Sequence, residues 1–124
     1  MTYDAGQKSP ENVKEMALKA LDADKALEIE MIDLRGLTSI ADYMIVASGT
    51  SSRHVSAMAD KLAERLNILG LKDVRIEGQE SSEWVIVDAG DVIIHLFKPE
   101  VRSFYNLEKM WNVPHTAPAH LATV

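Results

Sequence analysis

The chain has 124 residues, of which 47% are hydrophobic and 26% charged, so it can bury one core and is too apolar for a disordered segment. The formal net charge is -6, with 13 Lys and Arg against 19 Asp and Glu, which argues against a protein that binds nucleic acid through phosphates. The absence of cysteine excludes disulfides, thiolate catalysis and thiolate zinc sites. No apolar run is long enough to span a membrane and no signal pattern opens the chain, so we expect a cytoplasmic protein.

The first part of the chain predicts a helix followed by two strands. Residues 1–8 are expected to form a flexible tail. Ser9-Pro10 has the capping residue and first-turn proline of a helix start, and apolar residues follow at helical spacing. Alternating apolar and acidic residues predict a half-exposed strand over 27–34, and the nearly all-apolar run 43–47 predicts a strand covered on both faces.

A strand–helix–strand unit is predicted next. The turn SGTSS at 48–52 precedes a second amphipathic helix, which Gly70 is expected to end in the left-handed conformation. Residues 72–77 alternate in the manner of another half-exposed strand. Because a helix joins them, we expect the strands on either side of it to form a parallel pair.

Two apolar strands, 84–88 and 91–97, are separated only by Ala89-Gly90, which predicts a tight antiparallel hairpin. Side-chain alternation sorts its residues onto two faces. The mixed face carries Trp84, Ile86, Ile93, His95 and Phe97. The aliphatic face, suited to a core beneath the helices, carries Val85, Val87, Val92, Ile94 and Leu96.

The end of the chain predicts a short helix over 99–111 and a flexible tail over 112–124, so residues 9–111 should form a single domain. The order of elements predicts an α/β (α+β) fold. We expect a mixed sheet of about five strands, with the two main helices on one face and the short C-terminal helix elsewhere.

Two sets of polar residues are candidates for ligand chemistry. The backbone N–H groups of the SGTSS turn could hold a phosphate, but helix capping by Thr50 or Ser51 explains the same residues and no P-loop spacing is present. Asp88 and Asp91, which a turn at Ala89-Gly90 would place face to face, could hold Mg²⁺. They lack a third carboxylate, and aspartates commonly flank turns, so the structural interpretation is favoured.

Histidines add no catalytic set. His54 lies in the first turn of the second helix near serines, but a Ser–His pair needs a third group and an oxyanion hole, and neither is visible. His115 and His120 stand in the C-terminal tail without partner ligands. We therefore expect no enzyme activity, metal or cofactor.

The mixed face of the hairpin is the stronger candidate. Trp84, predicted to lie opposite His95 and near Phe97, combines aromatic area with polar tips, which is typical of protein interfaces. The last helix would add Tyr105 and Glu108 on one stripe. From the residues alone, burial of Trp84 beneath that helix and contact with a partner are equally good interpretations.

Three ordered motifs resemble the ribosomal silencing factor family, also called Iojap-like proteins. They are ADYMIVASGTSSRHV, EGQESSEWVIVDAGDVIIHLF and RSFYNLEKMW, within a match from about 27 to 111. The resemblance implies a nucleotidyltransferase-like fold without catalysis. It also implies a translational repressor that binds the large ribosomal subunit through large-subunit ribosomal protein fourteen and blocks joining of the small subunit. The expected partner-binding residues are Trp84, Asp88, Tyr105 and Glu108 from the resemblance, with His95 and Phe97 from the hairpin geometry.

Two alternatives stay open. One is a nucleotidyltransferase-like enzyme that binds a nucleotide with Asp88, Asp91 and the SGTSS turn. The other is a self-associating module in which the open sheet face of one copy pairs with that of another, and such a homodimer is compatible with ribosome binding. Contact with ribosomal RNA is expected to be peripheral at most, because the chain is acidic.

Overall fold

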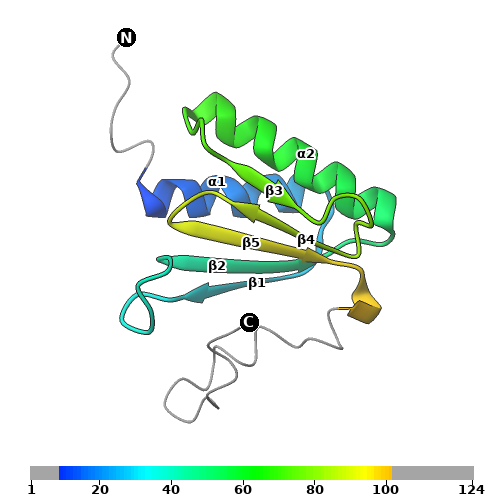
Figure 1. Cartoon of the computed structure of the whole chain (residues 1–124), viewed down its shortest axis with the longest axis horizontal. Helices are drawn as coiled ribbons and strands as arrows, with labels where there is room; N and C mark the ends of the chain where they lie inside the picture. Colours follow the sequence, from blue (N-terminus) through cyan, green and yellow to red (C-terminus); the bar gives the residue numbers. More distant parts are fainter. Residues whose placement is uncertain (1–8, 102–124) are drawn as a thin grey trace.

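The structure, a computed structural model, describes residues 9–101 of the chain. Within this range two helices pack on one mixed sheet of five strands (Figure 1). The elements are α1 (Pro10–Ala23), β1 (Leu27–Asp33), β2 (Tyr43–Ser48), α2 (Ser52–Leu69), β3 (Arg75–Glu77), β4 (Trp84–Asp88) and β5 (Val92–Phe97). The predicted α+β class and the five-stranded mixed sheet are confirmed.

Capping residues mark the start of α1 and the end of α2. The side chain of Ser9 accepts a hydrogen bond from the backbone N of Asn12 at 3.2 Å, and Pro10 occupies the first turn, where its missing N–H is not needed. α2 ends at Gly70, whose φ of 116° is left-handed. Each helix buries one apolar stripe, as predicted. The buried residues are Val13, Ala17, Ala20 and Leu21 in α1 and Val55, Met58, Ala59, Leu62 and Leu66 in α2.

The sheet has the order β1-β2-β5-β4-β3, in which β2 and β5 are parallel and the other neighbours antiparallel. The expectation that the strands flanking α2 pair with each other is wrong. β3 runs in the same direction as β2, but β5 and β4 lie between them. β5 pairs with β2 over six residues and is largely buried, whereas β3 has only three residues, so the longer apolar strand takes the central place.

The edge strand β1 departs from simple alternation. Its pairing with β2 shifts by one residue between Leu27 and Glu30, and Glu28 within this bulge has a φ of 49°. The bulge leaves Leu27 exposed opposite Ser48, while Ile29 packs against the helices. The predicted half-exposed strand is therefore present, with a local reversal of faces that the alternating sequence does not reveal.

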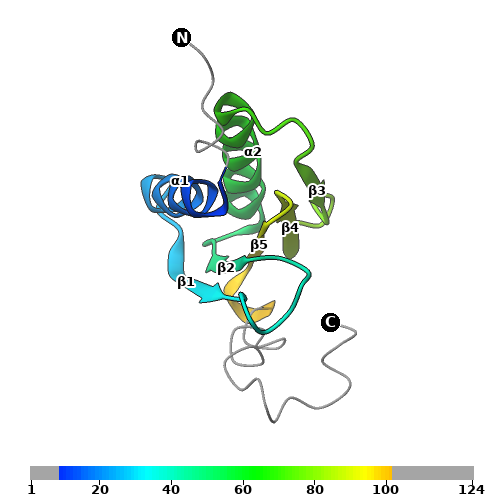
Figure 2. The same ribbon diagram turned by 90° about the vertical axis from the view of Figure 1, so that its left-hand side faces the viewer.

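The two faces of the sheet are covered differently. Figure 2 shows α1 and α2 side by side on one face, and the connection between β1 and β2 on the other. The aliphatic side of the hairpin lies in the main core under the helices, as predicted. A second, smaller cluster fills the opposite face, which is called the helix-free face because neither α1 nor α2 covers it within residues 9–101. Its buried members are Ile32, Leu34, Ala41, Met44, Val46 and Phe97, with Trp84, Ile93 and Val101 packed against them.

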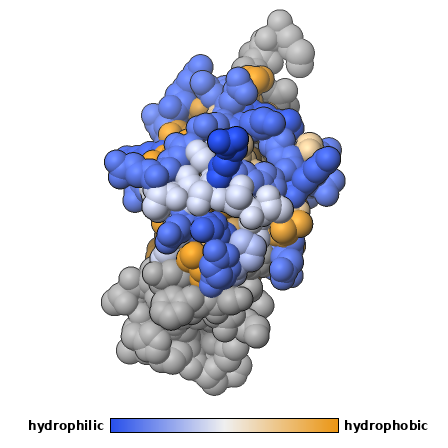
Figure 3. Space-filling view, turned by 90° about the vertical axis from the view of Figure 1, so that its right-hand side faces the viewer, coloured by the Kyte–Doolittle hydropathy of each residue, from blue (hydrophilic) through white to orange (hydrophobic). Residues whose placement is uncertain are grey.

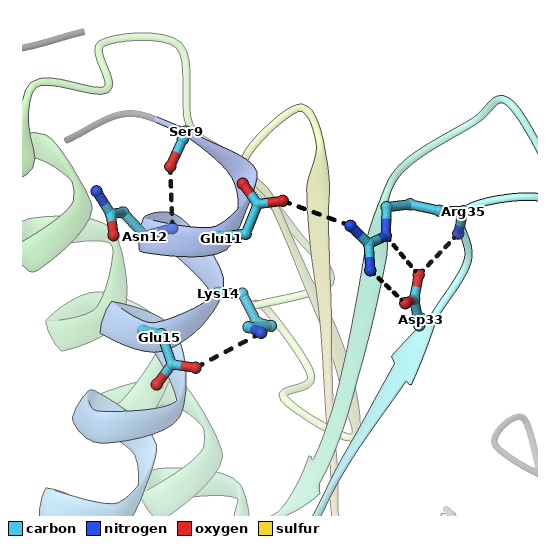
Figure 4. A network of polar contacts seen from close by, with 7 residues as sticks. All are labelled: Ser9, Glu11, Asn12, Lys14, Glu15, Asp33 and Arg35. Atoms are coloured by element: carbon cyan, nitrogen blue, oxygen red, sulfur yellow. Dashed lines mark hydrogen bonds and ion pairs between the residues drawn. The ribbon is translucent and has the colours of Figure 1, made fainter. Parts of the chain in front are cut away.

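A polar network fixes the start of the β1–β2 connection to α1 (Figure 4). Arg35 donates to both carboxylate oxygens of Asp33, at 3.0 and 2.7 Å, and lies 3.5 Å from Glu11 of α1. The hydrogen bonds from Arg35 lower the pKa of Asp33 to about 2. The Arg35 guanidinium also lies over the buried ring of Tyr43, at 5.1 Å from its centroid. This network links α1 to the β1 edge of the sheet.

Several expectations fall partly or wholly outside the described residues. Residues 99–101 are helical, which agrees with the start of the predicted last helix, but the rest of that helix and both tails lie beyond the description. The domain limits of 9 and 111 and the nucleotidyltransferase-like relationship stay predictions. No helix in the range 9–101 has the length and apolar character needed to cross a bilayer.

Candidate functional site

The β4–β5 hairpin is the platform of the candidate site, and its register differs from the predicted one. Ala89 N donates to the Val92 carbonyl at 3.0 Å, so the turn is centred on Gly90-Asp91 instead of Ala89-Gly90. Gly90 adopts a φ of 85°, which suits this tight turn. Facing pairs therefore shift by two residues. Trp84 lies opposite Phe97 and not His95, and Asp88 lies opposite Ile93 and not Asp91.

A shift of two residues keeps every side chain on its face. The predicted mixed face of Trp84, His95 and Phe97 is therefore confirmed, and it is the helix-free face of the sheet. β5 runs between β2 and β4, so His95 and Phe97 project from the centre of the sheet, whereas Trp84 projects from the strand next to its edge. Trp84, the largest of the three rings, is therefore the one nearest to the β3 edge of the sheet.

Three rings on this face form one aromatic group, Trp84–His95–Phe97. The Trp84 and Phe97 rings stack with centroids 5.1 Å apart and planes inclined by 27°. The His95 centroid lies 5.8 Å from Trp84 and 6.1 Å from Phe97. Trp84 is half-buried, His95 is 8% exposed and Phe97 is fully buried. Of the three rings, Trp84 offers the main surface to a partner.

Phe97 is the most deeply buried of the three rings. Its side chain is enclosed by the second cluster of the helix-free face and stacks on Trp84, so as it lies it has no surface for a partner. Its position at the end of a central strand, opposite Trp84, explains this burial. Phe97 thus supports the Trp84 indole from behind, and its expected role as a partner contact stays a prediction.

A hydrogen bond links the half-exposed ring to the buried one. Trp84 Nε1 donates to His95 Nδ1 at 2.9 Å. An indole nitrogen can only donate, so Nδ1 of His95 is unprotonated and the imidazole proton resides on Nε2. Burial lowers the pKa of His95 to about 4, and the imidazole is therefore neutral near pH 7.

The two aspartates of the hairpin have structural contacts, Asp88 within the turn and Asp91 with the start of β2. Asp88 is half-buried, and its Oδ1 accepts a hydrogen bond from Gly90 N at 2.9 Å, which stabilises the turn. Asp91 is exposed, and its backbone carbonyl accepts from the backbone of Asp42 and Tyr43. Across residues 9–101, no three His, Asp or Glu side chains gather as a metal site would require. Asp88 stays a candidate contact for a basic side chain of a partner.

The SGTSS turn also has a structural role. Ser51 is the N-cap of α2, and its hydroxyl accepts from His54 N at 3.1 Å. Thr50 N donates to His54 Nδ1 at 2.9 Å, so Nε2 carries the proton and donates to the carbonyl of Asp24 at 2.8 Å. His54 thus joins the start of α2 to the end of α1. Figure 3 views the end of the molecule at which α2 begins and β5 ends, and its surface there is mainly hydrophilic with only small apolar spots.

Replacement of the cap separates this capping role from phosphate binding. Ser51→Ala is expected to lower the free energy of unfolding by about 1 kcal/mol, because one N-terminal N–H of α2 loses its partner. Ser52→Ala, one residue further into the same helix, is the matched control. It should change the free energy of unfolding by only a few tenths of the loss expected for Ser51→Ala. Urea unfolding with and without millimolar phosphate measures both effects. Stabilisation by phosphate that disappears in Ser51→Ala would instead support an anion site.

The loop that precedes Trp84 contains residues that sequence reasoning missed. A Cβ atom on Gly78 would lie 2.3 Å from the carbonyl oxygen of Trp84, and Gly78 has a φ of 86°. Ser82, buried with a φ of 56°, donates through its backbone N to the Gly78 carbonyl at 3.0 Å. Gln79 Nε2 donates to Asp60 of α2 at 2.7 Å. A glycine directly after a strand was the available signal, and it reveals a close approach only once the fold is known.

Four of the six expected contacts lie within the described residues. Tyr105 and Glu108 lie outside the described residues, so their position relative to Trp84 stays a prediction. Among the described candidates, the structure brings Trp84, His95 and Phe97 into direct contact and leaves Asp88 on the same face, four residues along β4 from Trp84. The site defined by this geometry is a supported aromatic surface on the face that also carries Asp88.

Comparison with known structures defines the class first. A crystal structure of a protein from Chromobacterium violaceum superposes with a TM-score of 0.81 at 40% identity and covers 84% of this chain and 87% of that chain. The chain is thus an α+β protein of a class already known from bacteria.

Sequence comparisons identify the family. A family profile described as "Ribosomal silencing factor during starvation" matches residues 7–122. The "Ribosomal silencing factor RsfS" of Zymomonas mobilis is 57% identical over 82% of this chain and 77% of its own length. The mouse protein "Mitochondrial assembly of ribosomal large subunit protein 1" is 35% identical over 80% of this chain and 45% of its own length. The chain belongs to the ribosomal silencing factor family, which confirms the resemblance seen in its motifs.

Proposed function

We propose that this chain represses translation by docking on the large ribosomal subunit, through large-subunit ribosomal protein fourteen, so that the small subunit cannot join. Membership of the ribosomal silencing factor family supports a ribosome-associated silencing role. The name of the mouse relative refers to the large ribosomal subunit, which favours that subunit as the target. Steric exclusion requires only that the site be occupied, so the proposed mechanism contains no catalytic step. The proposed location is the cytoplasm.

The observation that carries the proposal is the supported indole of Trp84 on the helix-free face. Phe97 stacks against it and His95 holds its N–H, so the ring is fixed before any partner arrives. Rigid aromatic side chains at the centre of an interface supply much of its binding free energy and lose little conformational entropy. Trp84 is therefore the proposed anchor.

Charge supports a basic partner. The chain carries a formal net charge of -6, and Asp88 lies on the same face as Trp84. Complementary charge speeds the encounter with a Lys- and Arg-rich surface and discriminates against acidic partners. Tyr105 and Glu108 remain proposed contacts on the segment that follows the described residues. Ribosomal RNA, which is polyanionic, would be at most a peripheral neighbour.

The two alternative functions are weighed on the same residues. A nucleotidyltransferase-like enzyme would need a carboxylate set, but Asp88 and Asp91 do not face each other and no metal-binding group of three forms in the described range. Self-association through the helix-free face stays a prediction. It would compete with docking for Trp84, and size measurements across protein concentrations test it.

Replacement of Trp84 tests the proposed function. Trp84→Ala is expected to weaken binding to purified large subunits about thirtyfold, because truncation of an aromatic anchor typically costs about 2 kcal/mol. Ile68→Ala is the matched control, since Ile68 is a large apolar residue, 79% exposed, on the helix that covers the opposite face. Co-sedimentation in density gradients at moderate salt measures binding, and the yield of whole ribosomes measures the block of subunit joining.

The control result decides how the experiment is read. Wild-type protein and Ile68→Ala should co-sediment with large subunits and reduce the formation of whole ribosomes to the same extent. Wild-type protein that stays at the top of the gradient contradicts the proposed function. Equal loss of binding in both variants would show that Trp84 has no special place in the interface.

A further inference from the structure

We propose that His95 is a positioning residue of the docking surface, whose Nδ1 atom fixes the Trp84 indole in the orientation in which it meets its partner. This inference rests on the proposed function and adds to it the group that prepares the anchor. It assigns to the Nδ1 atom of His95 the task of orienting the indole, which a side chain that only fills space could not perform.

The indole N–H of Trp84 is bonded within the protein. An indole has one polar donor, and in Trp84 that donor points inward to His95 Nδ1 at 2.9 Å. The polar atom is therefore satisfied within the protein. What the half-exposed ring offers to a partner is apolar and π surface, which suits an aliphatic side chain or an Arg or Lys cation lying over the ring. Docking then does not depend on a hydrogen bond between the indole and the partner.

The acceptor, His95, is held rigidly by its surroundings. His95 lies on the central strand β5, with Ile86 of β4 and Val46 of β2 as its cross-strand neighbours. It is 8% exposed, and the plane of its ring is nearly parallel to that of the Phe97 ring, at an interplanar angle of 10°. A side chain held on three sides cannot swing, so its Nδ1 defines one direction for the Trp84 N–H.

A purely structural role at position 95 would not require an imidazole. The helix-free face encloses aliphatic side chains such as Val46 and Met44, and a leucine at position 95 would fill a similar volume. The imidazole adds one thing that leucine lacks, namely an acceptor within 2.9 Å of the half-exposed indole. Without it, the ring would keep its stacking on Phe97 but lose the bond that sets its tilt. A loosely oriented anchor loses affinity, because binding must then order it.

Two substitutions at position 95 test the assignment. The Oδ1 atom of asparagine can take the place of imidazole Nδ1, so His95→Asn keeps the acceptor, whereas His95→Leu keeps volume and removes it. In the isolated protein, the indole N–H resonance of Trp84, assigned by its loss in Trp84→Phe, reports the hydrogen bond. We expect His95→Leu to shift this resonance and speed its exchange with water, and His95→Asn to retain most of the wild-type behaviour.

Affinity for purified large subunits gives the functional readout. His95→Leu should bind about tenfold more weakly than wild type, the scale of one lost hydrogen bond, and His95→Asn should recover most of that loss. If His95→Leu does not fold, His95→Gln replaces it, since its longer side chain carries the acceptor to the position of Nε2 and away from the indole. His95→Asn and His95→Gln are then matched in polarity and differ in the position of the acceptor. Their melting temperatures show whether both variants are equally stable.

The outcomes separate the inference from the function on which it rests. Wild-type affinity in His95→Leu, together with a displaced indole resonance, overturns the positioning role while leaving the proposed docking intact. An indole resonance that is identical in His95→Leu and wild type shows that the bond does not orient Trp84. Absence of binding by the wild-type protein overturns the proposed function and the docking role of His95 together, and the spectra still decide whether His95 orients the ring.

Discussion

Gly78→Ala is expected to lower the free energy of unfolding by about 3 kcal/mol or more, because the new methyl group meets the backbone on which Trp84 is built. The added Cβ would lie 2.3 Å from the Trp84 carbonyl oxygen, and a backbone atom cannot rotate away as a flexible side chain can. The φ of 86° at Gly78 adds the strain of an L-residue in the left-handed region. Urea unfolding followed by circular dichroism measures the loss.

Gly36 provides the matched control for this prediction. Its φ of 87° is almost the same, but nothing lies within 4 Å of the position that its Cβ would take. Gly36→Ala should therefore cost only the conformational strain, about 1 kcal/mol. Equal losses in the two variants would contradict the close approach as the cause. Because the clash falls on Trp84 itself, Gly78→Ala should also alter the fluorescence of the folded protein and weaken docking, whereas Gly36→Ala should do neither.

Local chemistry made the individual elements predictable. Ser9, Pro10 and Gly70 act through bonds and dihedral angles within a few residues of themselves, and they mark helix ends in the sequence as they do in the structure. Strand β4 was likewise predicted with its observed limits, because an apolar run bounded by polar residues leaves little choice. Which strands become neighbours depends on the whole chain. The parallel pairing of β2 with β5 joins residues about fifty positions apart, and no local pattern distinguishes it from pairing with β3.

In the hairpin, the predicted turn was displaced by one residue, but the predicted faces of the site were still correct. Both Ala89-Gly90 and Gly90-Asp91 can form a two-residue turn, and the bonds from Ala89 to Val92 and from Gly90 to Asp88 Oδ1 select the second. Since side chains alternate with a period of two, the facing partners changed while the faces did not. The aromatic face was therefore predictable, whereas the facing of Asp88 and Asp91 was not.

The depth of each ring within that face could not be read from the sequence. Phe97 and Trp84 are both large and aromatic, and their different exposure comes from the positions of β5 and β4 in the sheet. The bond between Trp84 and His95 joins diagonal neighbours across the hairpin, so it also depends on the observed register. The sequence predicts that the three rings share one face. Only the fold shows that Trp84 is the half-exposed one and that Phe97 and His95 lie behind it.

The same burial that makes His95 a rigid acceptor makes the fold sensitive to acid. Burial lowers the pKa of His95 from 6.5 to about 4. Above pH 6.5 the imidazole is neutral in both the folded and the unfolded chain, and stability is at its full value. As the pH falls from 6.5 to 4, the unfolded chain takes up a proton that the folded chain refuses, so stability declines. At about 1.4 kcal/mol for each pKa unit, the loss by pH 4 is about 3 kcal/mol.

Urea unfolding at intervals between pH 7 and pH 4 measures this loss, and His95→Asn is the control because it removes the titrating group and keeps the acceptor for Trp84. The cross-strand neighbours Val46 and Ile86 and the ring of Trp84 do not titrate in this range, so His95 is the titrating group among these residues. Asp33 acts in a lower window, since hydrogen bonds from Arg35 lower its pKa from 3.8 to about 2. Below pH 3.8 the wild type and His95→Asn should therefore lose stability in parallel. An equally steep decline of His95→Asn between pH 6.5 and 4 would show that another group is responsible and that the imidazole is less enclosed than the fold indicates.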